Sequence, residues 1–182
     1  MYTKFTLLQR FRNKVKLKGS YELLLAKNAK IVNCTISIIG NNNRLTIEDN
    51  TVLRYTNIEI LGDNCLISIG ANSIMGHGCY LSAKEGKKLQ IGSGCMFSRN
   101  AKVMTSDGHF IYKDDKIINA GKDISIGSNV WLADNVTVLK GVNIGDGSVV
   151  GINATLTTSI QAKSIAVGNP AQVVKENIVW KI

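Results

Sequence analysis

Histidine, proline and cysteine are scarce in this chain of 182 residues, and each scarcity narrows what the protein can do. Its two histidines cannot supply the three imidazole ligands of a three-histidine zinc site. The four cysteines lack the close spacing of metal-ligand or redox motifs. We therefore expect no metal, and we expect reduced, buried thiols at Cys34, Cys65, Cys79 and Cys95.

Long hydrophobic runs and a leader segment are also missing. No uninterrupted apolar stretch approaches the roughly 18 residues needed to span a bilayer. The first residues mix charged with apolar side chains and lack a small-residue cleavage site, so we expect no secretory signal and a cytoplasmic protein. The length fits one domain with a core of its own.

Positive charge is abundant, since 22 lysines and arginines against 13 acidic residues give a formal net charge of +9. Six cations crowd the first eighteen residues among apolar side chains: Lys4, Arg10, Arg12, Lys14, Lys16 and Lys18. A basic, amphipathic start suggests contact with an anionic polymer or the inner face of a membrane, although a solvated cap would have the same composition. Aromatic interleaving that stacks single-stranded bases is absent, so we expect no nucleic-acid partner.

A six-residue period governs the sequence between residues 124 and 160. Aliphatic residues recur at every sixth position, and a small or β-branched residue stands four positions after each of them. An amphipathic helix would need a 3.6-residue period, which these spacings do not keep. Three hexapeptides can close a triangular coil, and coils stack at the strand spacing of about 4.8 Å. The pattern predicts an all-β parallel solenoid with six inward residues in this region: Ile126, Leu132, Val138, Ile144, Val150 and Leu156.

The repeat of an aliphatic residue, Gly, two variable residues and a small residue resembles that of the hexapeptide-repeat acyltransferases. Ile126-Gly127 and Ile144-Gly145 carry this phrase, as does Ile91-Gly-Ser-Gly-Cys95. The resemblance implies a left-handed parallel β-helix, a hand that spacing alone does not give. We expect this β-helix over residues 31–167, between a basic cap of residues 1–30 and a C-terminal cap of residues 168–182. The resemblance also implies a homotrimer.

One long insertion interrupts the repeat before Ile126. The stretch from Ile91 to Ile126 holds one coil of about 18 residues and about 17 more. The extra segment, residues 105–123, is polar and contains His109. Insertions into a regular scaffold tend to carry function, and imidazole can take a proton from a sugar hydroxyl near neutral pH. We expect the other histidine, His77, to be an ordinary turn residue without a catalytic role.

Capsular-polysaccharide and sugar O-acetyltransferases are similar around this insertion. The chain has Ser106-Asp107-Gly108-His109 and then Gly127-Ser128-Asn129-Val130-Trp131. The resemblance implies that His109 is the catalytic base and that Trp131 lines the active site. Trp131 should face outward, where its N–H could donate to an oxyanion or its ring could pack on another subunit. Asp107 could orient the His109 ring, or it could simply form an Asp-Gly turn.

The segment Gly168-Asn169-Pro170-Ala171 resembles the turn that ends the β-helix in this family, near the adenine of coenzyme A. Two departures weaken the match, because Thr158 stands where relatives have lysine and Gln172 where they have arginine. Lys163 and Lys175 remain as point-charge partners for phosphates. The cofactor-binding residues implied by the resemblance are Trp131, Ala133, Gly151, Thr157, Thr158, Lys163, Pro170 and Lys175.

These patterns favour an acetyl-CoA-dependent O-acetyltransferase that acts on a carbohydrate hydroxyl, most simply in a capsular or other surface polysaccharide, by direct transfer with a histidine general base. N-acetylation of an amino-sugar nucleotide and a non-catalytic solenoid scaffold are the alternatives. A serine acetyltransferase would need a long helical N-terminal domain, which about thirty residues before the coils do not provide. The acceptor sugar itself stays open.

Overall fold

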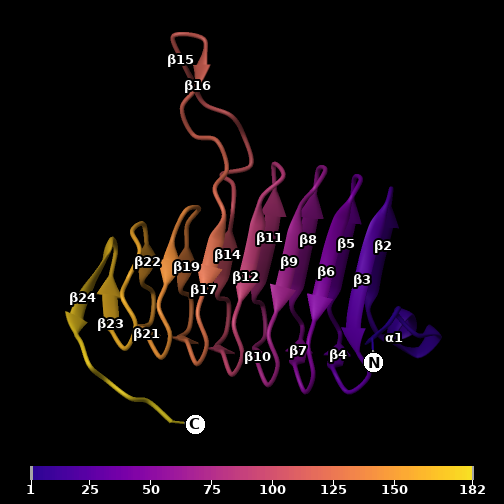
Figure 1. Ribbon diagram of the computed structural model, residues 1–182, viewed down its shortest axis with the longest axis horizontal. Helices are drawn as coiled ribbons and strands as arrows, with labels where there is room; N and C mark the ends of the chain where they lie inside the picture. The colour runs from indigo at the N-terminus through magenta and orange to yellow at the C-terminus, as the bar shows by residue number, and fades with distance from the viewer. Residues whose placement is uncertain (1, 182) are drawn as a thin grey trace.

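The structure, a computed structural model, describes residues 2–181 and consists of a left-handed parallel β-helix with one protruding arm (Figure 1). The chain passes repeatedly through three sheets in the order first, second, third. The first sheet contains β1 (Tyr2–Thr3), β3 (Tyr21–Ala26), β6 (Asn43–Ile47), β9 (Leu66–Ile69), β12 (Lys88–Ile91), β17 (Ile124–Ile126) and β20 (Asn143–Ile144).

The second sheet contains β4 (Lys30–Val32), β7 (Val52–Arg54), β10 (Ile74–Met75), β13 (Met96–Phe97), β18 (Trp131–Leu132), β21 (Val149–Val150), β23 (Ile165–Gly168) and β24 (Ala171–Lys175). The third contains β2 (Lys14–Lys18), β5 (Thr35–Ile39), β8 (Asn57–Leu61), β11 (Tyr80–Lys84), β14 (Lys102–Met104), β19 (Thr137–Val138) and β22 (Thr155–Leu156). Neighbouring strands are parallel except where β1 meets β3 and β24 meets β23.

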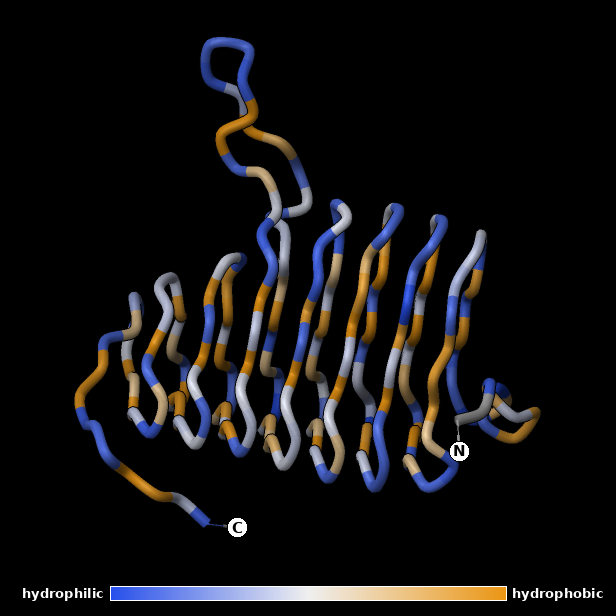
Figure 2. Tube along the Cα trace, viewed as in Figure 1, coloured by the Kyte–Doolittle hydropathy of each residue, from blue (hydrophilic) through white to orange (hydrophobic). Residues whose placement is uncertain are grey.

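The core is a set of apolar columns inside the three sheets. All six residues of the predicted inward column, from Ile126 to Leu156, are buried, which confirms the prediction. The four cysteines are also buried and free, as expected. Polar and apolar residues alternate along the longer strands, as the coloured trace shows (Figure 2), so each strand buries one face and exposes the other.

The coils are larger near the N-terminus than near the C-terminus, and Figure 1 shows the taper. In the first sheet Leu45 pairs with Ile67, 22 residues on, whereas Ile126 pairs with Ile144, 18 residues on. The difference lies in strand length, because β5 has five residues and β19 has two. The larger coils near the N-terminus therefore hold their additional residues in longer strands.

The solenoid begins earlier than the sequence indicated. Residues 14–26 were expected in a cap, yet β2 pairs in parallel with β5 and β3 pairs in parallel with β6. These first coils lack the hexapeptide motif and show only a two-residue alternation, as in Lys14–Lys18. A search for a six-residue period therefore does not detect them.

The ends of the chain close the solenoid differently. The short helix α1 (Leu7–Arg12) begins at Thr6, whose hydroxyl accepts from the Gln9 N–H in a capping box. The antiparallel strand β24 ends the parallel winding at the other end, and the chain then runs back to Trp180. No helix among the described residues is long and apolar enough to cross a membrane.

Candidate active site

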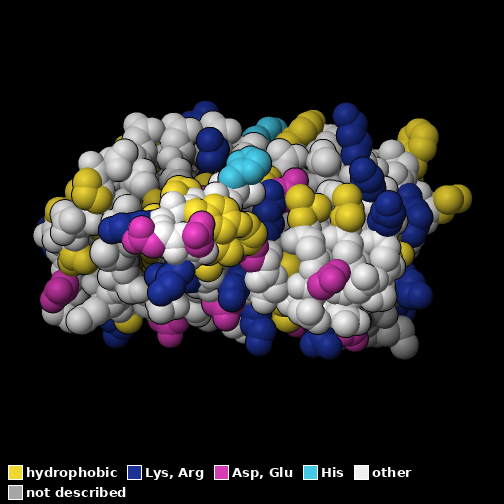
Figure 3. Space-filling model, turned by 90° about the horizontal axis from the view of Figure 1, so that it is seen from above, with side chains coloured by type: hydrophobic (Ala, Val, Ile, Leu, Met, Phe, Trp, Pro, Cys, Tyr) yellow, Lys and Arg dark blue, Asp and Glu magenta, His cyan; other side chains and the backbone are white. Residues whose placement is uncertain are grey.

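Residues 105–123 leave the solenoid as an arm, at the corner where the chain passes from β14 in the third sheet to β17 in the first (Figure 1). The predicted insertion is therefore confirmed. A small hairpin of β15 (Tyr112–Lys113) and β16 (Lys116–Ile117) forms its tip. Seen from above, hydrophobic side chains gather on it (Figure 3). Its large apolar residues are between 43% and 62% exposed: Phe110, Ile111, Tyr112, Ile117 and Ile118.

Glu85 holds the base of the arm together. The Ser106 hydroxyl donates to one carboxylate oxygen of Glu85, and the Gly121 N–H donates to the other at 2.7 Å. One carboxylate thereby joins the outgoing and returning segments of the arm. The six-residue repeat gave no sign of this role of Glu85.

A second network lies further along the arm and centres on Asp107. Its carboxylate pairs with Lys140, which follows β19 at the same corner one coil later, and accepts from Asn119 Nδ2 at 2.9 Å. The Lys140 ammonium group, followed by the Asn119 amide, holds the pKa of the Asp107 carboxyl below its usual value. Lys140 also donates to the Asn119 carbonyl at 2.6 Å.

His109 lies just beyond this network with an exposed side chain. Asn119 Nδ2 donates to the His109 backbone carbonyl at 2.9 Å. Across residues 2–181, no hydrogen bond joins the Asp107 carboxylate to the imidazole. The Asp107 carboxylate thus contacts Lys140 and Asn119 instead of the ring of His109.

Trp131 lies on the outer face of the second sheet, as expected, and is half-buried. Its indole N–H donates to the Ser98 hydroxyl at 3.1 Å, so this donor already has a partner in the isolated chain. The ring of Trp180, from the C-terminal segment, lies against it with centroids 5.9 Å apart, and its own N–H donates to the Asn129 carbonyl at 2.7 Å. Nothing in the repeat pointed to Trp180.

The other predicted cofactor residues fall into separate groups. Ala133 and Gly151 directly follow β18 and β21 of the second sheet, but their N–H groups already bond to the next coil, at 2.9 and 2.8 Å. Pro170 and Lys175 close the same sheet. Lys163 lines a hollow of about 250 Å³ beside Trp180, at the corner between the first and second sheets.

Thr157 and Thr158, in contrast, follow β22 at the corner that carries the arm. His109 therefore shares a corner with the two threonines, while Trp131 occupies the sheet on the opposite side of the solenoid (Figure 1). A single chain does not bring the predicted base and the predicted tryptophan together. The sequence predicted that both side chains lie outside the core. It did not predict on which side of the solenoid each lies, because that depends on the number of residues in each coil.

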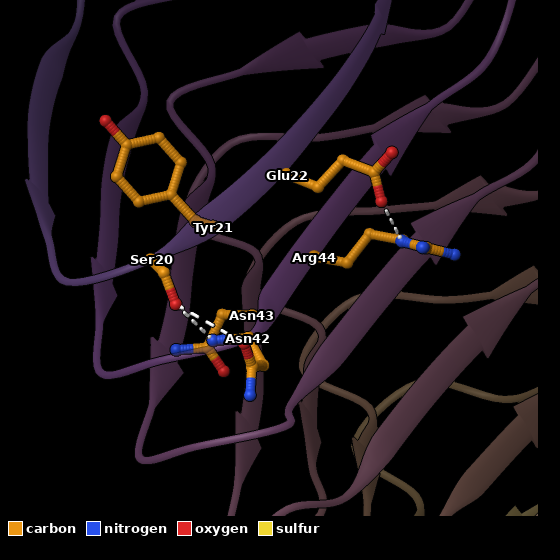
Figure 4. Close-up of a pocket in the computed structure, with 6 residues that line it drawn as sticks. All are labelled: Ser20, Tyr21, Glu22, Asn42, Asn43 and Arg44. Carbon is orange, nitrogen blue, oxygen red and sulfur yellow. Dashed lines mark hydrogen bonds and ion pairs between the residues drawn. The ribbon is translucent and has the colours of Figure 1, made fainter.

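Another hollow, of about 340 Å³, opens at the start of the first sheet (Figure 4). Glu22 and Arg44 form an ion pair at 2.6 Å there, and the Ser20 hydroxyl accepts from the Asn42 N–H at 2.8 Å. None of the predicted site residues lines it. Within the described chain, no three His, Cys, Asp or Glu residues are grouped to hold a metal.

Comparison with known proteins identifies the family of this left-handed β-helix. No family model matches the chain. It is 40% identical over 159 residues to a polysialic acid O-acetyltransferase of Neisseria meningitidis, covering 86% of this chain and 73% of that protein. A polysialic acid O-acetyltransferase of Escherichia coli O1:K1 / APEC is 36% identical, over 69% of this chain and 43% of its own length.

Solved structures agree with these relatives. The polySia-specific acetyltransferase NeuO superposes with a TM-score of 0.75 and 31% identity, covering 94% of this chain and 83% of NeuO. The polysialic acid O-acetyltransferase OatWY gives a TM-score of 0.76 and 30% identity, covering 93% and 90%. The chain belongs to the family of hexapeptide-repeat acetyltransferases that includes these polysialic acid O-acetyltransferases, and it is an acyltransferase.

Proposed function

We propose that this protein transfers the acetyl group of acetyl-CoA to a hydroxyl of an anionic capsular polysaccharide. The observation that carries the proposal is the rigidly anchored arm that presents His109, in a chain 40% identical to a polysialic acid O-acetyltransferase. The net charge of +9 suits an acceptor with one carboxylate on each sugar.

In the proposed reaction, an unprotonated ring nitrogen of His109 accepts the proton of the acceptor hydroxyl as that oxygen attacks the thioester carbonyl carbon. The tetrahedral intermediate then collapses, the carbon–sulfur bond breaks, and the imidazolium returns the proton to the departing thiolate. No cysteine takes part, because all four thiols are buried in the core. Trp131 would line the acyl site, with its N–H available to an oxyanion only after it releases Ser98.

We propose further that the active form is a homotrimer in which the arm of one subunit reaches the second sheet of its neighbour. Two exposed apolar surfaces support this arrangement. One is the arm itself, and the other is an outward row in register on the second sheet, in which Ile74 is exposed and Val52, Met96 and Trp131 are half-buried. Their contact would bury both and bring His109 to Trp131.

The acetyl donor would then lie between subunits, along the C-terminal coils. Thr157 and Thr158 from the corner of the arm, and the backbone carbonyl of Ala133 and the surface at Gly151 from the second sheet, would border its pantetheine chain. Pro170 would lie near the adenine, and Lys163 and Lys175 would pair with its phosphates as point charges. Gly151 is also required by packing, since a Cβ there would lie 2.7 Å from Val167 Cγ1.

We also propose that the protein works in the cytoplasm, with α1 resting on the inner face of the membrane. Leu7 is 87% exposed and is flanked by Arg10 and Arg12 in the same helix. Apolar side chains beside cations suit an anionic bilayer surface. Sedimentation with phosphatidylserine vesicles should decrease in Leu7→Ser/Leu8→Ser, and equal sedimentation of this variant and the wild type would refute the contact.

The deciding experiment measures acetyl transfer from acetyl-CoA to de-O-acetylated polysialic acid. His109→Ala should lose at least about 100-fold in kcat, as expected for removal of a general base. Asp115→Asn, at the exposed tip of the same arm, serves as the control and should keep wild-type turnover. If His109→Ala kept more than about a tenth of the turnover, the base assignment would be abandoned. Transfer to an amino-sugar nucleotide instead of the polymer would favour the N-acetyltransferase alternative.

A further inference from the structure

The corner between the second and third sheets contains a column of residues in the left-handed backbone conformation. Backbone hydrogen bonds between successive coils align Asn33, Tyr55, Gly78, Asn100, Asn135 and Asn153 there. Asparagine and glycine tolerate this conformation, whereas a residue with a bulky Cβ substituent is strained in it. Tyr55, with a φ of 52°, is the exception in the column.

Tyr55 has no packing role that explains this strain, because its side chain is 49% exposed. Its ring lies against the imidazole of His77 on the next coil, with centroids 4.4 Å apart and planes tilted by 36°. The pair forms an aromatic platform open to solvent. A strained, exposed aromatic residue at a position suited to asparagine indicates a surface function.

Cationic side chains accompany this platform. Arg54, His77 and Arg99 immediately precede the turn residue on three successive coils. Arg99, at the C-terminal end of this series, pairs with Asp134. Neither Arg54 nor Arg12 has a carboxylate within ion-pair distance in the described part of the chain. Since coils stack about 4.8 Å apart, these groups form a regular line along the solenoid axis.

The line continues at its N-terminal end into a groove of about 300 Å³ beside α1. Arg12, Lys14, Asn33 and Tyr55 are among its lining residues. Figure 3 shows lysine and arginine side chains concentrated at this end of the molecule. We call Arg12, Arg54, Tyr55, His77 and Arg99 the corner strip. It lies at a different corner of the chain from the arm and shares no residue with the proposed active site.

We propose that the corner strip is a holding site for an anionic polysaccharide chain. A sugar ring stacks on the Tyr55–His77 platform, while carboxylates on neighbouring sugars pair with Arg12, Arg54 and Arg99. The inference rests on the proposed function and deepens it: the polymer is held along the axis away from His109, and only part of its length enters the reaction. Affinity should therefore grow with polymer length, because each added contact is intramolecular.

The test uses Arg54→Ser/Tyr55→Asn, which removes one cation and the platform. Asparagine is the residue that neighbouring coils already place in this conformation, so Tyr55→Asn alone should raise Tm by about 2–4 °C. Lys88→Ser, an exposed cation on the first sheet, is the control for charge. Binding of fluorescently labelled, de-O-acetylated polysialic acid is measured by anisotropy without any acetyl donor.

The double variant should bind the long polymer at least about tenfold more weakly, with Lys88→Ser within about twofold of wild type. In transfer assays its KM for the polymer should rise by a similar factor, while kcat on a short sialic acid oligomer stays unchanged. Equal affinity of the double variant and the wild type would overturn the proposal, as would an equal loss in Lys88→Ser. Equally tight binding of a single-stranded oligonucleotide of matched charge would also overturn it. Polymer binding without any acetyl transfer would refute the proposed function and leave the corner strip standing.

Discussion

The ammonium group of Lys140 pairs with the carboxylate of Asp107 across one coil of the solenoid. Lys140 belongs to the regular scaffold and Asp107 to the arm, two residues before His109. The same ammonium group donates to the Asn119 carbonyl on the returning side of the arm. A single, mostly buried cation thus connects both sides of the arm to the scaffold and fixes where His109 stands.

Lys140→Met should reduce kcat by about tenfold, because a misplaced general base loses part of its contribution to the transition state. The KM for acetyl-CoA should change little, since Lys140 does not lie in the proposed donor site. Lys140→Arg should restore most of the activity by renewing the charge. Steady-state kinetics with both substrates varied would separate these effects, and unchanged kcat in Lys140→Met would refute the positioning role.

The Asp107–Lys140 pair also predicts a dependence of the arm on pH. The pKa of Asp107 is lower in the folded protein than in the unfolded chain, so the pair stabilises the folded arm above the usual carboxyl pKa of about 3.9. This contribution is lost only as pH falls through the lowered value. The protection of residues 106–121 against hydrogen exchange, relative to the intrinsic rate at each pH, should be the same at pH 7 and pH 5 and should fall only below the usual carboxyl pKa of about 3.9. In Asp107→Asn the exchange should lack this acid step.

Glu85→Gln should loosen the base of the arm without disturbing the core. The carboxylate accepts both bonds as a charged group, whereas a neutral amide can accept only the Gly121 N–H and would have to donate to a turned Ser106 hydroxyl, so both charge-assisted bonds are lost. Limited proteolysis should then cut between residues 106 and 121 several-fold faster, while the Tm of the solenoid changes little. Glu22→Gln, on the far end of the first sheet, is the matched control. Equal cleavage of both variants would contradict the clamp.

The core and the insertion could be predicted because they follow from simple periodicity. A residue that points into the core, such as Leu132, must be apolar, and the six-residue spacing of apolar residues therefore identifies the inward positions. The first coils were not predicted because β2 and β3 are longer strands, in which the sequence shows only a two-residue alternation and no six-residue period. The site was less predictable, since the arm that carries His109 is held by Glu85, Asn119 and Lys140. Contacts between coils depend on which residues of neighbouring coils are aligned. The six-residue repeat does not determine this alignment when the coils differ in length.

Burial of the thiols predicts that the protein resists thiol reagents. Burial raises the pKa of Cys79 to about 11 and that of Cys95 to about 11, and it also raises the pKa of Cys34 and Cys65. At pH 8 only about one in a thousand molecules with such a thiol carries the thiolate. Native protein treated with iodoacetamide should stay unmodified and fully active, whereas protein in guanidinium should be alkylated at all four cysteines. Inactivation of the native protein would point to a covalent intermediate.

Trp180 should influence the environment of Trp131 and the binding of the acetyl donor. Trp180→Ala removes the ring that lies 5.9 Å from that of Trp131, which exposes the indole to water. Tryptophan emission should shift to longer wavelength, and the KM for acetyl-CoA should rise by a few-fold, while Trp180→Phe should retain most of the wild-type behaviour. If Trp180→Ala and Trp180→Phe had the same KM as the wild type, the C-terminal segment would have no role at the donor site.

His109 and Trp131 lie on opposite sides of one chain, so a shared active site requires two subunits. This leads to a complementation experiment with His109→Ala and Trp131→Ala, each of which should be inactive alone. In mixed trimers, an intact site forms wherever the arm comes from a Trp131→Ala subunit and the second sheet from a His109→Ala subunit. Random mixing of equal amounts should therefore restore about a quarter of the wild-type activity. Unfolding and refolding the two proteins together, with each refolded alone as the control, measures this recovery. If the mixture stayed as inactive as the separate variants, the site would be confined to one chain, and the proposed contact between arm and second sheet would have to be given up.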